Sequence, residues 1–160
     1  MKVRIGFAPG PFPSEAEGQD LLRDLVLLGE RYGYDSLWLS DRVVGGRFPL
    51  EPIVALSMVA AYSETLKFGT SVLALPLRNP VLLAKELATL DYLSNGRLLP
   101  AIGLGQEDPT EYEACGVSKE GRGQRADEAI EVIRRLWEED QVTHEGRFFT
   151  LHDVSIVPKP

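Results

Sequence analysis

Two adjacent charged residues, Asp41 and Arg42, follow an apolar run and are the first candidates for chemistry. A carboxylate beside a permanent cation can orient a polar substrate or stabilise a negative charge that develops on it. A structural reading is equally open, in which Asp41 accepts hydrogen bonds from local amides and Arg42 forms a surface ion pair. Glu107 follows another apolar run and is a candidate general acid, although a solvated acidic loop is the plainer reading. Asp41, Arg42 and Glu107 are therefore the candidate catalytic residues.

Two glycines flank Leu104 directly after an apolar run, and they are candidates for ligand contact. Glycine lets the backbone approach a ligand closely because it has no Cβ. Gly103 and Gly105 lack, however, the third glycine of the dinucleotide-binding fingerprint. The two histidines, His144 and His152, are too isolated in the sequence to indicate a metal site, and no metal is expected.

Four apolar strands that alternate with helical patterns must position these residues. The strands are expected at residues 2–8, 35–41, 66–75 and 98–102, and the helices at residues 14–33, 52–62, 79–92 and 126–137. The first strand is expected to be buried, because Val3, Ile5 and Phe7 alternate on one face. Gly33 and Asn95-Gly96 are expected to end the first and the third helix. A repeat of about 30 residues is that of a strand–helix–strand unit. The pattern predicts an α/β fold of four parallel (β/α) units, which is half of an eightfold TIM-type barrel of about 250 residues. Ligands bind at the carboxyl ends of such strands, where the candidate residues lie.

The C-terminal part of the chain departs from this repeat. A polar loop is expected to about Gln124, before the fourth helix. Residues 142–151 are expected to form a hairpin that turns at Glu145-Gly146, followed by an extended run over residues 152–157. No linker is visible, so a single domain is expected over residues 1–160.

Charge and composition disfavour several classes of protein. Lysine and arginine number 17 against 24 aspartates and glutamates, which gives a net charge of −7 and a pI near 4.9. That balance disfavours sequence-independent nucleic-acid binding, which needs a basic surface. The single cysteine, Cys115, cannot form an intramolecular disulfide. No uncharged stretch is long enough to span a bilayer and no signal-peptide core follows Met1, so we expect a cytoplasmic protein without membrane contact.

Several long segments resemble the bacterial luciferase-like superfamily of flavin- and deazaflavin-dependent oxidoreductases. They are "YDSLWLSDR" (34–42), "GTSVLALPLRNPVLLAKELATLDYLSNGR" (69–97), "AIGLGQ" (101–106), "RGQRADEAIEVIRRLW" (122–137) and "HEGRFFTLHDVSIVPKP" (144–160). The resemblance implies an eight-stranded barrel that binds FMN or an F-420-type deazaflavin at its carboxyl face. It also implies a small-molecule substrate, to which hydride or oxygen is transferred. In such enzymes the cofactor supplies the redox chemistry and the protein positions it.

The resemblance also assigns residues around the cofactor ring. Ser71-Val72 matches a bulge where the family often has a non-proline cis peptide behind the ring. By the same matching, the residues that line the ring are Thr70, Ser71, Val72, Gly103, Leu104 and Gln106. Arg42 stands where the family commonly has histidine, and arginine cannot shuttle a proton near neutral pH. Gln106 stands where some deazaflavin enzymes have glutamate.

The length of the chain departs from the family pattern, because the family holds the cofactor phosphate mainly with the second half of its barrel. Four strands alone leave two open sheet edges and one uncovered face. We expect a homo-oligomer; a second half on another polypeptide and a truncated sequence are the alternatives. Three functional hypotheses follow. The first is a flavin- or deazaflavin-dependent oxidoreductase, and the second is a non-catalytic half-barrel that keeps the fold and self-association but not the binding of the cofactor phosphate. The third is a flavodoxin-like binding domain. A strand order of 1-2-3-4 would exclude the last.

Overall fold

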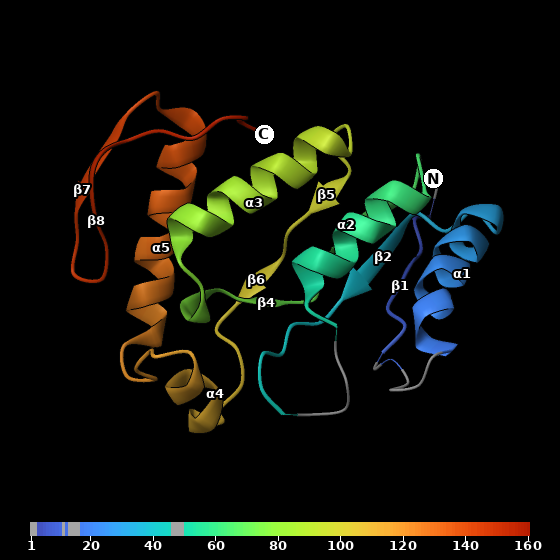
Figure 1. The fold of residues 1–160 in the computed structure, drawn as a ribbon, viewed down its shortest axis with the longest axis horizontal. Coiled ribbons are helices and arrows are strands. Elements are labelled where there is room, and N and C mark those ends of the chain that lie inside the picture. Colours follow the sequence, from blue (N-terminus) through green and yellow to red (C-terminus); the bar gives the residue numbers. More distant parts are fainter. Residues whose placement is uncertain (1–2, 11, 13–16, 46–49) are drawn as a thin grey trace.

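Strands and helices alternate along the chain (Figure 1). The computed structural model describes residues 3–10, 12, 17–45 and 50–160, without the side chains of residues 17–19. The elements are β1 (Gly6–Phe7), α1 (Glu17–Arg31), β2 (Ser36–Leu39), α2 (Pro52–Tyr62), β3 (Lys67–Thr70), β4 (Leu73–Ala74), a 3-10 turn (Leu75–Leu77), α3 (Pro80–Leu93), β5 (Leu98–Leu99), β6 (Ile102–Gly103), α4 (Pro109–Ala114), α5 (Arg122–Glu138), β7 (Val142–Glu145) and β8 (Thr150–Val154).

The strands of the main sheet follow the order of the chain. The sheet order is β1-β2-β3-β5 and every neighbouring pair is parallel. A second parallel pair, β4 and β6, lies directly beyond β3 and β5 along the chain. This monotonic order confirms the predicted parallel (β/α) units and excludes the flavodoxin-like order.

Helix starts follow local capping signals. The Glu51 side chain accepts a hydrogen bond from the Val54 amide and Pro52 occupies the first turn of α2. Asn79 caps α3 in the same way, with Pro80 in the first turn. Proline suits this position because the first-turn amides have no partner within the helix. The predicted helices over 52–62 and 79–92 are confirmed to within one residue.

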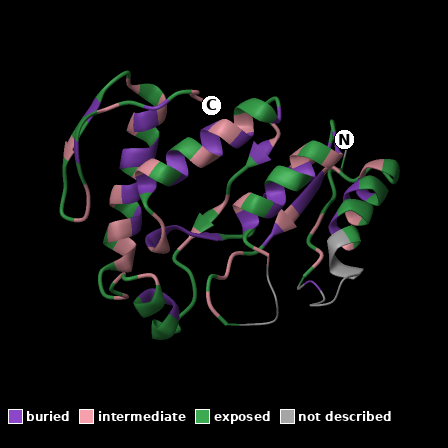
Figure 2. Ribbon diagram, viewed as in Figure 1, coloured by how far each residue is buried: buried purple, intermediate pink, exposed green. Residues whose placement is uncertain are grey.

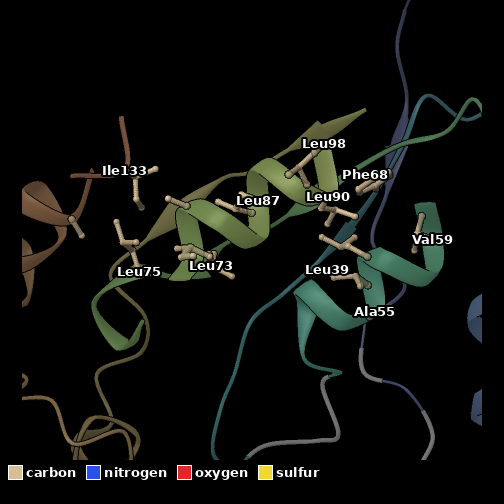
Figure 3. Close-up of a cluster of buried hydrophobic side chains, with 14 of the residues drawn as sticks. Leu39, Ala55, Val59, Phe68, Leu73, Leu75, Leu87, Leu90, Leu98 and Ile133 are labelled. Carbon is tan, nitrogen blue, oxygen red and sulfur yellow. The ribbon is translucent and has the colours of Figure 1, made fainter. Parts of the chain in front are cut away.

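The core lies between the sheet and the helices. Figure 3 shows side chains of β2, β3 and β5 and of α2 and α3 pointing into one cluster, which includes Leu39, Phe68, Leu98, Val59 and Leu87. In Figure 2, α2, α3 and α5 are each buried along part of their surface and exposed along the rest. This pattern is expected of helices that cover a sheet on one face.

The opposite face of β2 bears Trp38, which alternates with the buried Leu37 and Leu39. A Cβ built on Gly6 of β1 would lie 2.7 Å from the indole Nε1, and one built on Gly69 of β3 would lie 2.8 Å from the indole Cζ3. The indole therefore spans three strands, over the two glycines of its neighbours.

Three predictions about the elements need correction. Residue 2 lies outside the described residues, and the strand that was expected to be buried at residues 2–8 forms only over Gly6–Phe7. Val3 and Ile5 are 69% and 59% exposed. In the described part of the chain β1 has β2 as its only strand neighbour, so no strand packs beside β1 on its other edge. The strands expected at 66–75 and 98–102 are each interrupted, after Thr70 and after Leu99.

The third correction is α4, which forms where a polar loop was expected before Gln124. The predicted hairpin is confirmed: β7 and β8 are antiparallel, with Val142 opposite Val154 and His144 opposite Leu151. The extended run that was expected from residue 152 begins inside β8. Among the described residues, no helix combines the length and the hydropathy that crossing a bilayer requires.

Candidate active site

The segments after β3 and β5 lie side by side at the carboxyl edge of the sheet. The Thr70 hydroxyl donates to the Ala101 carbonyl at 2.7 Å and accepts from the Ala101 amide at 3.1 Å. The Leu73 amide donates to the same carbonyl at 2.8 Å. Between these contacts, the peptide bond from Ser71 to Val72 is cis, as the family resemblance predicted.

Val72 packs against Gly103, which explains the glycine. A Cβ built on Gly103 would lie 2.6 Å from Cγ2 of Val72, closer than real Cβ contacts allow. Val72, Ile102 and Leu104 remain 44%, 39% and 41% exposed, so large apolar side chains face outward at this edge. A partly exposed apolar surface next to a glycine fits the flat ring of a flavin or deazaflavin. Gln106 is also exposed, further along the same segment.

Asp41 connects this edge to the neighbouring elements. Its Oδ2 accepts a hydrogen bond from the Ala74 amide at 2.9 Å, and its side chain is 1% exposed. Both of its carboxylate oxygens accept from Nη2 of Arg78, which also donates to Glu51 at 2.9 Å. Through these hydrogen bonds Asp41 fixes the position of β4, the strand that follows Val72.

Arg42 belongs to the loop that follows β2. Its Nε donates to the Val44 carbonyl at 2.9 Å, and its Nη2 lies 3.5 Å from Oδ2 of Asp108. The side chain is 29% exposed. The guanidinium is therefore held locally and remains accessible to a ligand.

The ion-pair partners of Glu107 are residues other than Asp41 and Arg42. It forms ion pairs with Lys119, at 2.9 Å, and with Arg122 at the start of α5, and its side chain is 77% exposed. The hydrogen bond from Arg122, followed by the one from Lys119, lowers the pKa of Glu107 to about 2. A carboxyl group with this pKa has no proton to donate near neutral pH.

Sequence reasoning missed three residues that hold the site together: Arg78, Glu111 and Tyr112. Glu111 and Tyr112 are the buried residues of α4, each 1% exposed. A local signal for α4 exists, because Asp108-Pro109 repeats the cap and first-turn proline that Asn79-Pro80 provides for α3. No local signal marks Arg78, whose partner Asp41 is 37 residues away in the sequence.

The chain is similar to several known proteins. A family model described as luciferase-like monooxygenase matches residues 3–160. The F420-dependent glucose-6-phosphate dehydrogenase of Kineococcus radiotolerans is 36% identical over 163 residues, which cover 96% of this chain and 44% of the relative. The chain therefore spans about half the length of the curated relatives that it matches.

Solved structures show the same half-length match. The monooxygenase RslO1 from Streptomyces bottropensis superposes with a TM-score of 0.87 at 27% identity, over 98% of this chain and 50% of that one. An F420-dependent secondary alcohol dehydrogenase in complex with an F420-acetone adduct superposes with a TM-score of 0.83 at 26% identity, over 100% of this chain and 50% of that one. The fold matches about half of each of these enzymes' chains. Its strand order agrees with a TIM-type barrel.

Proposed function

Because the chain belongs to the luciferase-like monooxygenase family, we propose that it acts in an oxidoreductase that binds FMN or an F-420-type deazaflavin and a small organic substrate. The observation that supports this most directly is the packing of Val72 against Gly103, with Val72 and Leu104 partly exposed beside it. The names of the glucose-6-phosphate dehydrogenase and the alcohol dehydrogenase favour the deazaflavin.

The proposal gives the residues around the ring two kinds of role. Val72 and Leu104 would contact the ring through their side chains, and Gly103 would leave room for that contact. Thr70 would hold the Ser71-Val72 segment against Ala101 through its two hydrogen bonds. The bound cofactor would accept or deliver the electrons that the substrate gives or takes.

The other charged and polar candidates, apart from Glu107, would bind or position groups at the site. Arg42 is permanently charged, so it would orient a negative or polar group of the substrate. Asp41 would position β4 through the Ala74 amide, and the exposed Gln106 would donate or accept a hydrogen bond at the ring edge. Glu107, which is ionised, is given no role as an acid.

Titration of the purified chain with each cofactor tests the proposal. We expect a perturbed absorbance spectrum and quenched cofactor fluorescence with FMN or with the deazaflavin, at saturable stoichiometry. No spectral change with either compound would contradict the proposal. That result would instead favour the alternative of a non-catalytic half-barrel, which keeps the fold but not the binding of the cofactor phosphate.

We propose further that the chain self-associates. Leu99 and Ile102 are 37% and 39% exposed, and β1 and β5 each have one strand neighbour among the described residues. Exposed apolar side chains and open strand edges favour association with another surface. Light scattering at micromolar concentration should return at least a dimer mass, and a monomer mass would contradict it.

The single Cys115, which needs no oxidising compartment, is consistent with the proposed cytoplasmic location.

A further inference from the structure

Helix α4 lies between two loops of the candidate site. One is the loop after β2, residues 41–45, and the other is the segment after β6, residues 104–108. Figure 1 shows α4 at the edge of the molecule where both loops run. The helix has six residues, and only Glu111 and Tyr112 among them are buried.

Glu111 holds the loop after β2. Its Oε1 accepts hydrogen bonds from the Val43 amide at 2.6 Å and from the Val44 amide at 3.4 Å. A buried carboxylate needs such partners, because its removal from water is unfavourable unless hydrogen bonds in the protein replace those of water. The contact fixes the backbone next to Arg42, whose own Nε donates to the Val44 carbonyl.

Tyr112 holds the segment after β6. Its hydroxyl donates to the Leu104 carbonyl, and burial raises the pKa of this hydroxyl, so it keeps its proton near neutral pH. Gly105 follows with a φ of +79°, a conformation that glycine adopts readily. A third contact joins the two sides, since Asp108, which caps α4, lies 3.5 Å from Nη2 of Arg42.

We propose that Glu111 is a positioning residue, which together with Tyr112 makes α4 a clamp that fixes Arg42 relative to Leu104 at the candidate ring site. Adjacent residues of one short helix each bind the backbone of a different loop, so a displacement of either loop must move the helix and hence the other loop. The link to the ring rests on the proposed function. The link between the loops does not.

Amide exchange measured by NMR tests the link between the loops. In the Glu111→Ala variant we expect the Val43 amide to exchange at least about tenfold faster, since it loses a charge-assisted hydrogen bond. The Glu111→Gln variant keeps an acceptor oxygen and should recover part of the protection. The Tyr112→Phe variant removes only the hydroxyl group, yet it should also accelerate the exchange of the Val43 amide. The exposed Glu113, on the same helix, provides the control variant Glu113→Ala, which should leave the exchange rate of the Val43 amide unchanged.

Cofactor titration tests the link to the site. Glu111→Ala should weaken the binding of the deazaflavin or FMN by about tenfold, with Glu111→Gln between it and the unmodified chain. If Val43 exchange does not respond to Tyr112→Phe, the clamp is refuted. If exchange responds but the dissociation constants stay unchanged, Glu111 has only a structural role and the positioning proposal fails. If the unmodified chain binds neither cofactor, the proposed function fails, and exchange at Val43 alone decides whether the clamp exists.

Discussion

Arg78 donates hydrogen bonds from Nη2 to both carboxylate oxygens of Asp41, at 2.9 and 3.0 Å, and from Nε to Oδ2 at 3.3 Å. The two side chains are 16% and 1% exposed, so the ion pair is largely shielded from water. Since Oδ2 also accepts from the Ala74 amide, the pair fastens the end of β2 to β4. The segment that follows Val72 depends on this contact for its position.

Removing Asp41 should therefore destabilise the fold. We expect Asp41→Ala to lower the free energy of unfolding by about 3 kcal/mol, because Arg78 would be left largely buried without its main partner. Asp41→Asn keeps an acceptor and should cost less. The control is Arg134→Ala, which breaks an exposed ion pair with Glu138 at 3.8 Å and should cost less than about 0.5 kcal/mol. Urea denaturation measures all three, and equal losses for Asp41→Ala and Arg134→Ala would contradict the prediction.

The contact of Val72 with Gly103 gives a compensating pair of substitutions. Gly103→Ala places a Cβ 2.6 Å from Cγ2 of Val72 and should cost about 1–3 kcal/mol. The double variant with Val72→Ala removes that methyl group and should recover most of the loss. Gly123→Ala is the control, since a Cβ there meets nothing within 4 Å. Thermal denaturation that shows no recovery in the double variant would rule out this contact as the cause.

The ion pairs of Glu107 predict its titration. Its pKa falls from 4.5 to about 2 through Arg122 first and Lys119 second. The ion pairs therefore stabilise the folded state above about pH 4.5, and this contribution is lost as the pH falls towards 2. NMR titration of the carboxyl carbon should give the low value, and Arg122→Gln should raise it. Arg134→Gln, on the same helix, should leave it unchanged. A Glu107 pKa that Arg122→Gln does not move would show that the ion pair is absent in solution.

Glu128 should hold the hairpin of β7 and β8 onto α5. Its carboxylate accepts from the amides of Arg147, Phe148 and Phe149, at distances between 2.8 and 3.2 Å, and lies 3.3 Å from Nε2 of His144. Burial opposes ionisation, but these hydrogen bonds outweigh it and lower the pKa of Glu128. Glu128→Ala should accelerate amide exchange at Phe148 and Phe149 and cost about 1–3 kcal/mol. Unchanged exchange at both amides would count against this contact.

Much of the fold follows from the sequence because the signals are local. The stops at Gly33 and Gly96 are confirmed by their positive φ values of 74° and 72°. The burial of Val3 and Ile5 was mispredicted. Apolar residues that alternate along a strand lie on the same face of it, but the alternation does not show whether another element covers that face. That cover comes from neighbours in space, and β1 has one strand neighbour in the part of the chain that the structure describes.

The site was less predictable because its contacts join distant parts of the chain. Glu111 binds the Val43 amide 68 residues away, and no spacing rule connects a carboxylate to a backbone group at that distance. The capping pattern at Asp108-Pro109 can be recognised in the sequence. Tyr112 is, however, the single large apolar residue of α4, so the helix has no periodic pattern of apolar residues that would predict it. The cis peptide before Val72 was anticipated through the family resemblance, and no residue pattern in this sequence predicts it by itself.

The indole of Trp38 restricts how related sequences can diverge. The three atoms nearest to a Cβ at position 6 belong to the side chains of Ser36 and Trp38, and both of these can become smaller. At position 69 a Cβ would also lie 2.0 Å from the carbonyl oxygen of Leu99, which is backbone and cannot be exchanged. Across an alignment of relatives, position 6 should covary with positions 36 and 38, whereas position 69 should stay glycine in every lineage that keeps this pairing of β3 with β5.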